Sequence, residues 1–145
     1  MSDYKKVLFV QSMGEDEYEI ESLWCTQDGD NYVIDNIPFV AKNISSGDVI
    51  KVEYVEEENA YYFEEIVEPS GNSTIRVLVD DVELITSIRE SLSSLGCESE
   101  AFLSRKLIAV NVPKDIDYRP IRTFLDKGEQ DNKWEYQESC LAHEY

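Results

Sequence analysis

The chain has 145 residues, 42% of them hydrophobic, which is enough for one domain of ordinary size or two very small ones. Its 31 acidic and 13 basic residues give a formal net charge of −18 at pH 7, which argues against nucleic acid and anionic membrane surfaces as partners. Three cysteines without CxxC spacing, and no apolar run long enough for a signal peptide or a membrane span, predict a cytoplasmic protein with reduced thiols. We expect neither a metal nor another cofactor.

The first half of the sequence predicts short strands separated by turns. Residues 5–10 and 17–25 are rich in β-branched and aromatic side chains, as strands usually are. In the second segment Tyr18 and Ile20, extended by Ser22 and Trp24, fall on one face of a period-2 ribbon.

Two hairpins are expected before residue 70. Asp28 and Gly29 form a favoured turn pair, and an apolar run resumes over residues 31–44, interrupted by Pro38. Residues 49–67 then alternate as a hairpin around a turn at 56–60. Five or six short strands in about 70 residues are typical of a small barrel or rolled sheet.

The second half changes to a mixed pattern of strand, helix, strand, strand, helix and strand. Apolar residues at helical spacing run from Val82 to Leu95 before Gly96, and a second helix is expected to stop at Gly128. The expected elements are 73–79, 80–96, 97–104, 106–113, 115–130 and 133–141. This order is that of the ferredoxin-like class. We therefore predict an α+β fold, with residues 1–72 as an acidic all-β half (a small β-barrel or rolled sheet) and residues 73–145 as a ferredoxin-like βαββαβ half.

Charge is distributed unevenly between these halves. Residues 1–72 carry 17 acids and four lysines, whereas residues 73–145 carry 14 acids and nine bases. In the expected hairpin at 49–67, glutamates alternate with aromatic residues, a combination suited to docking a basic protein. The same charges would also protect a strand edge from unwanted pairing. The candidate partner-binding residues are Glu56, Glu57, Glu58, Tyr61, Tyr62, Glu64, Glu65 and Glu68.

The hydroxyl-rich segment at residues 68–74 is interpreted as the hinge between the halves. Catalysis by Ser70 or Ser73 would need a nearby base, and the one histidine of the sequence, His143, lies two residues from its end. We therefore expect no catalytic residues and no enzyme. Asp28 and Asp30 lack the spacing of a calcium loop.

Several stretches, taken in order, resemble a bacterial family known as domain of unknown function 4265. They are ESLW (21–24), YVIDNIPF (32–39), GDVI (47–50), SGNSTIRV (70–77), LGC (95–97), KLIAVNVP (106–113) and WEYQESCLAH (134–143). The resemblance implies a small cytoplasmic bacterial protein and transfers no catalytic residues. The acidic hairpin departs from the family pattern and suggests a specialised partner.

The family-like stretches contain polar residues able to converge on a pocket between the halves, or to form the hydrogen-bonded seam that joins them. These residues are Asp35, Asn36, Ser70, Ser73, Arg76, Trp134, Glu135 and His143.

The leading hypothesis for function is an immunity protein that inhibits a basic, nuclease-type bacterial toxin by occluding its active site. The alternative is a regulatory module that binds a small molecule between the two halves. A third hypothesis, an enzyme that uses His143 and a hydroxyl, is the least favoured.

Overall fold

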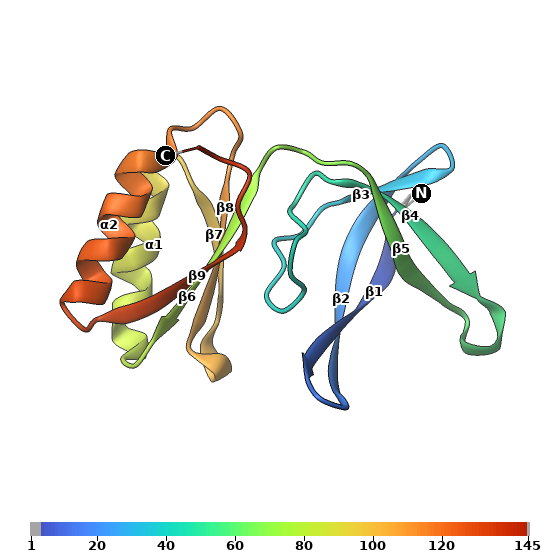
Figure 1. The fold of residues 1–145 in the computed structure, drawn as a ribbon, viewed down its shortest axis with the longest axis horizontal. Helices are drawn as coiled ribbons and strands as arrows, with labels where there is room; N and C mark the ends of the chain where they lie inside the picture. Colours follow the sequence, from blue (N-terminus) through green and yellow to red (C-terminus); the bar gives the residue numbers. More distant parts are fainter. Residues whose placement is uncertain (1–3, 145) are drawn as a thin grey trace. The chain divides into compact units, whose positions relative to one another are not determined.

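Two groups of strands, separated in the sequence at Ser70, organise the chain (Figure 1). The computed structural model describes residues 4–144, and its two compact units are Met1–Ser70 and Gly71–Tyr145. The first unit contains a closed five-stranded barrel, and the second contains a four-stranded sheet and two helices. The α+β prediction of a small barrel followed by a ferredoxin-like half is therefore confirmed.

The barrel joins strands that are neighbours in the sequence and closes through a parallel pairing of β1 with β5 at Val7 and Leu8. The other strand pairs are antiparallel, and Gly29, with φ of 62°, lies in the expected turn between β2 and β3. The strands are β1 (Tyr4–Gly14), β2 (Glu17–Asp28), β3 (Asn31–Ile34), β4 (Val49–Val55) and β5 (Ala60–Glu68).

A long loop follows β3, because the apolar run at 31–44 leaves the sheet at Ile34. Pro38 has no N–H to offer a strand ladder. The Glu21 carboxylate on β2 accepts hydrogen bonds from the backbone N–H groups of Phe39, Val40 and Ala41, at 2.7, 3.0 and 2.9 Å. The loop therefore folds around a carboxylate instead of pairing with a strand.

The barrel core uses one face of each strand, and in β2 it is the face of Leu23 and Cys25. Tyr18, Ile20 and Trp24 share the opposite face, as the period-2 pattern predicts, and this face is exposed. The buried cluster comprises Val7, Phe9, Leu23, Cys25, Tyr32, Ile34, Ala41, Ile44 and Ile50.

The second unit has the ferredoxin-like strand order β7-β8-β6-β9, with all pairs antiparallel. Two helices, α1 and α2, lie side by side on one face of this sheet (Figure 1). The elements are β6 (Ser73–Val79), α1 (Ile85–Ser94), β7 (Glu98–Phe102), β8 (Leu107–Val112), α2 (Tyr118–Gln130) and β9 (Trp134–Cys140). Short 3₁₀ turns in residues 4–144 are η1 (Glu56–Glu58) in the first unit, and η2 (Val82–Leu84) and η3 (Leu103–Arg105) in the second.

Helix α1 is shorter than the sequence predicts. The Asp81 carboxylate accepts a hydrogen bond from the N–H of Glu83, so the segment begins as the turn η2, where Val82 is exposed rather than part of the buried stripe. At the other end Gly96 takes a φ of 95°, and the N–H of Cys97 returns to the Leu92 carbonyl.

Helix α2 contradicts the prediction that Gly128 stops it, because the helix continues to Gln130. Gly128 is buried against the Trp134 indole, and a Cβ at this position would lie 1.8 Å from Cζ2 of that ring. Its role is to let β9 approach the helix closely. In the described residues 4–144, neither helix has the length and apolarity needed to cross a bilayer.

Candidate functional site

The acidic hairpin formed by β4, η1 and β5 presents its carboxylates to solvent. Six glutamates of the predicted partner-binding set are exposed: Glu56, Glu57, Glu58, Glu64, Glu65 and Glu68. Lys51 Nζ lies 3.9 Å from Glu65 Oε1 and forms an ion pair in this hairpin, with both side chains exposed. The hairpin therefore has a strong excess of negative charge.

The two predicted tyrosines of the hairpin, Tyr61 and Tyr62, are partly buried, whereas Tyr54 is exposed. Tyr61 packs against the barrel core and lies 4.9 Å from the Tyr54 ring, measured between centroids. Tyr62 donates a hydrogen bond to Glu58 Oε1 at 2.7 Å, and this bond to a carboxylate raises the pKa of the Tyr62 phenol. Tyr54 donates to Asn59 Oδ1 at 2.5 Å. The hairpin therefore presents mainly charge, because Tyr61 and Tyr62 make contacts within the unit.

Three residues of the predicted pocket lie in the first unit. Asn36 Oδ1 accepts from the N–H of Trp24 at 2.6 Å, and the N–H of Asp35 donates to the Trp24 carbonyl at 2.9 Å. The N–H of Ser70 donates to the buried Asp48 carboxylate at 2.8 Å. These contacts fix the backbone around Trp24 and at the end of the unit.

Ser73 and His143 meet in the second unit, although 70 positions separate them. His143 Nε2 lies 2.8 Å from the Pro113 carbonyl, an acceptor, so Nε2 carries the proton and Nδ1 accepts from the Ser73 hydroxyl at 2.5 Å. Ser73 Oγ in turn accepts from the backbone N–H groups of Ala142 and His143, at 2.8 and 3.3 Å.

This pairing resembles a nucleophile and its base, but its surroundings favour a structural role. Ser73 is fully buried, so a substrate has no access to its hydroxyl. Its oxygen is also occupied by the two N–H groups of the C-terminal segment. Ser73 therefore anchors that segment to the start of β6.

The remaining predicted residues of the second unit make contacts other than those of the Ser73 and His143 pair. Arg76, 7% exposed, donates from Nη2 to the Ser139 hydroxyl at 3.0 Å. Trp134 donates its indole N–H to the Leu125 carbonyl at 3.0 Å, whereas Glu135 on β9 is exposed. A single pocket uniting all eight predicted residues stays a prediction.

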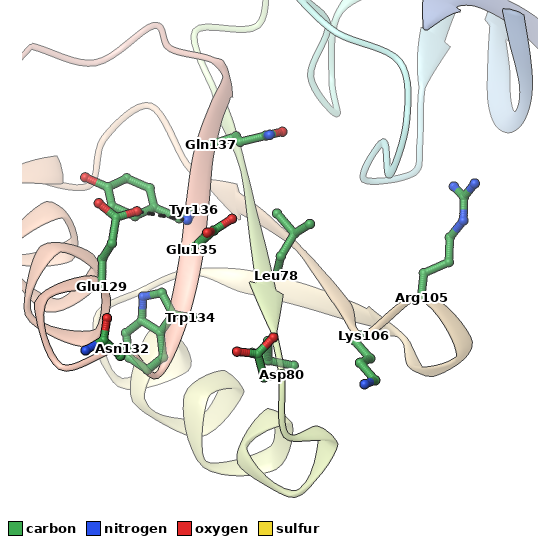
Figure 2. Close-up of a pocket in the computed structure, with 11 residues that line it drawn as sticks. Leu78, Asp80, Arg105, Lys106, Glu129, Asn132, Trp134, Glu135, Tyr136 and Gln137 are labelled. Atoms are coloured by element: carbon green, nitrogen blue, oxygen red, sulfur yellow. Dashed lines mark hydrogen bonds between the residues drawn. The ribbon is translucent and has the colours of Figure 1, made fainter. Parts of the chain in front are cut away.

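A groove of about 600 Å³ lies in the second unit beside β6 and β9 (Figure 2). Asp80 and Glu135 supply carboxylates, and Arg105 and Lys106 supply cations from the turn between β7 and β8. Glu129, near the end of α2, accepts from the N–H of Tyr136 at 3.4 Å. The groove combines both signs of charge in one place.

The two thiols that are buried in the described chain belong to the two apolar cores, Cys25 in the first unit and Cys97 in the second. Burial raises the pKa of Cys25 to about 12, with a smaller contribution from Asp35, and raises that of Cys97 to about 11. Both thiols are protonated at neutral pH and behave as small apolar groups. Among residues 4–144 no group of three or more His, Cys, Asp or Glu side chains could hold a metal ion.

The exposed apolar face of the β1–β2 hairpin is the surface feature that sequence reasoning missed. Tyr18, Ile20 and Trp24 form a period-2 stripe, but Leu23 and Cys25 form a second one on the other face. Because both faces of this strand carry apolar residues, the period-2 pattern does not tell which face points into the barrel. The sequence therefore does not predict that the face of Tyr18, Ile20 and Trp24 is exposed.

Comparison with known proteins places the chain in a family. The model described as "Domain of unknown function (DUF4265)" matches residues 21–136, which confirms the resemblance seen in the sequence. A hypothetical protein from Neisseria gonorrhoeae, solved by crystallography, has a similar fold with a TM-score of 0.81 and 23% identity. The similarity covers 99% of this chain and 98% of that one. No curated protein matches the chain.

Proposed function

We propose that this chain, which belongs to the family described as a domain of unknown function (DUF4265), is an acidic binding protein. Specifically, we propose an immunity protein that inhibits a basic, nuclease-type bacterial toxin by occluding its active site. The observation that carries the proposal is the row of exposed glutamates on the β4–β5 hairpin.

The physical reason is charge complementarity. A nuclease must hold phosphates, so its active site concentrates Lys and Arg side chains. A unit with a net charge of −13 over residues 1–70 would be steered to such a site, and electrostatic steering raises association rates by about 10- to 1,000-fold. Crowded like charges also destabilise a fold when it is alone, and a cationic partner would relieve that repulsion.

The proposal includes a cytoplasmic location. A protein that protects the nucleic acids of its own cell would act where those molecules are. The free thiols of Cys25 and Cys97 support this, because reduced cysteines are usual in that compartment.

The test is a binding assay between the immobilised chain and catalytically inactive, cationic nuclease-toxin domains. Affinity should fall steeply as salt rises from about 0.05 M to about 0.5 M, because screening shortens the range of charge attraction. Affinity that does not change with salt would contradict the proposal.

Two triple variants that lose the same charge distinguish an effect of the hairpin on binding from an effect of net charge alone. Glu56→Gln, Glu57→Gln and Glu58→Gln together should weaken binding strongly. The matched triple variant in the second unit removes the same charge from exposed positions and should have a smaller effect: Glu83→Gln, Glu98→Gln and Glu100→Gln. Equal losses would show that the hairpin has no special part in binding.

The groove in the second unit favours a second candidate, a module that binds a small molecule. Its volume of about 600 Å³ falls within the usual range for ligand pockets. Arg105 and Asp80 could together recognise a ligand that carries both an acidic and a basic group. A metabolite that raises the melting temperature of the native chain, but not of the Arg105→Ala variant, would support this function.

A further inference from the structure

The outer face of the β1–β2 hairpin carries large apolar side chains that the barrel does not cover. Tyr18 is 68% exposed, Ile20 56% and Val10 53%. Val10 and Ile20 are direct cross-strand neighbours, and Tyr18 lies opposite Ser12. The three side chains therefore share one face of the hairpin.

This face continues along the hairpin toward its aromatic end. Trp24 is 45% exposed, and its ring meets Tyr4 edge to face with centroids 6.4 Å apart. Lys6, opposite Trp24 in the register, places Nζ 5.1 Å from the centre of the indole. From Tyr18 to Trp24 the stripe spans about 20 Å at the usual rise of a strand.

The hairpin is accessible where the stripe lies. β3 pairs with β2 only from Cys25 to Asp28, and β5 pairs with β1 at Val7 and Leu8. The rest of the hairpin extends past these pairings as a two-stranded ribbon (Figure 1). One face of the ribbon is turned toward the barrel, and the other is open.

One end of the stripe is acidic, because Glu15, Asp16 and Glu17 form an exposed turn next to Tyr18. At the other end Lys6 lies over the Trp24 ring, and the exposed carboxylates of Asp28 and Asp30 follow four and six positions beyond Trp24. An apolar centre with a charged rim is the usual anatomy of a protein interface, and Trp and Tyr are frequent anchors in such centres.

We propose that this stripe is the anchoring surface for a cationic protein whose own contact patch has an apolar centre flanked by Lys or Arg. The inference rests on the proposed function and assigns its contact surface. A second copy of the chain is a poor occupant, because it would bring together units that each carry a net charge of −13. A partner with Lys or Arg beside its apolar centre complements the acidic turn at residues 15–17.

The stripe and the acidic hairpin have different parts in this scheme. The glutamates of the β4–β5 hairpin attract the partner and raise the association rate, whereas its Tyr61 ring is already packed inside. The stripe supplies apolar anchors, which slow dissociation. The association rate would therefore depend on salt through the β4–β5 hairpin, and the dissociation rate would depend on apolar contacts at the stripe.

The first arm of the test uses two synthetic peptides of about twelve residues, one alternating lysine with leucine and one alternating lysine with serine. In amide spectra of the isotope-labelled chain, the lysine–leucine peptide should shift residues 8–12 and 18–24 and bind about tenfold more tightly than its serine counterpart. Equal affinities, shifts elsewhere, or no binding would overturn the proposal.

Matched variants locate the anchor. Ile20→Ser should weaken binding of the lysine–leucine peptide about tenfold, whereas Val67→Ser, which alters an apolar residue of β5 that is 50% exposed, should change it less than about twofold. Val10→Ser provides an independent second variant should the first not fold. Equal effects of Ile20→Ser and Val67→Ser would overturn the assignment.

The second arm separates this inference from the proposed function. Any nuclease domain that binds the native chain is retested with Ile20→Ser and Val67→Ser. If Ile20→Ser and Val67→Ser reduce inhibition equally, or if neither reduces it, the assignment of the stripe as the anchoring surface is overturned. The proposed function would still hold in that case. Peptide binding at the stripe with no nuclease domain bound would support the stripe and contradict the proposed function. Dimers in sedimentation that Ile20→Ser dissociates would identify a second copy as the occupant and overturn the proposal.

Discussion

The hydroxyl of Ser73 donates to Nδ1 of His143 over 2.5 Å, and so joins the first residue of β6 to the C-terminal segment. The same oxygen accepts hydrogen bonds from two backbone N–H groups, and Nε2 of His143 donates to the Pro113 carbonyl at 2.8 Å. One buried hydroxyl therefore connects three distant parts of the second unit.

The Ser73→Ala variant should lose about 1–3 kcal/mol of unfolding free energy, because two N–H groups and one imidazole nitrogen lose their partner. In a double-mutant cycle with His143→Ala, the coupling should be about 0.5–1.5 kcal/mol. Urea unfolding measures both. Ser93→Ala, at an exposed position of α1, is the control. Purely additive losses would show that the two residues do not act together.

Gly128→Ala tests the close packing of α2 against β9. In an exposed helix this change would stabilise by about 1 kcal/mol, since alanine is the better helix former. Here the added methyl group would collide with Trp134, and we expect destabilisation by about 1–3 kcal/mol. Gln130→Ala, at an exposed site of the same helix, should change stability little. A stabilised Gly128→Ala protein would refute the contact.

Glu21→Ala removes the acceptor of three backbone N–H groups in the loop after β3. We expect the free energy of unfolding to fall by about 1–3 kcal/mol, together with faster amide exchange at residues 39–41. Glu17→Ala, an exposed carboxylate on the same strand, serves as the comparison. Unchanged exchange at residues 39–41 would mean that the carboxylate does not hold the loop.

The raised pKa of Cys25 should make the protein less stable in alkali. Above the ordinary thiol value of about 8.5, the unfolded chain releases this proton while the folded chain retains it up to about 12. The free energy of unfolding therefore falls as pH rises through this range, by up to about 1.4 kcal/mol per pH unit for one group. Cys25→Ala should make the decline shallower by that amount.

Urea titrations from about pH 8.5 to about pH 11 measure the decline. Val7→Ala, which truncates a neighbouring core residue that does not titrate, should lower stability at every pH without changing the slope. Identical slopes for the native protein and Cys25→Ala would contradict the shifted pKa.

Much of the fold follows from local patterns that agree with one another. The helical spacing of Ile85, Ile88 and Leu92, followed by Gly96, is sufficient to predict α1 and its end. The order of strands and helices predicts the sheet of the second unit, because this order has a well-known antiparallel solution.

The misplaced features depend on contacts between different elements of the fold. Gly128 is a helix stop by local rules, but the Trp134 indole, six positions later, occupies the space that a side chain would need. The loop after β3 requires Glu21, and no local signal links that residue to position 40. The Ser73 and His143 pair is likewise set by tertiary structure, although both residues were predicted candidates.

The most direct test of the proposed function is a titration of nuclease activity with the purified chain. With a cationic toxin domain and labelled DNA or RNA, we expect activity to fall linearly and to vanish near an equimolar ratio for the cognate domain. The triple variant Glu56→Gln, Glu57→Gln and Glu58→Gln should inhibit less at the same ratio. Full activity of every cationic nuclease domain in the presence of excess chain would contradict the proposal.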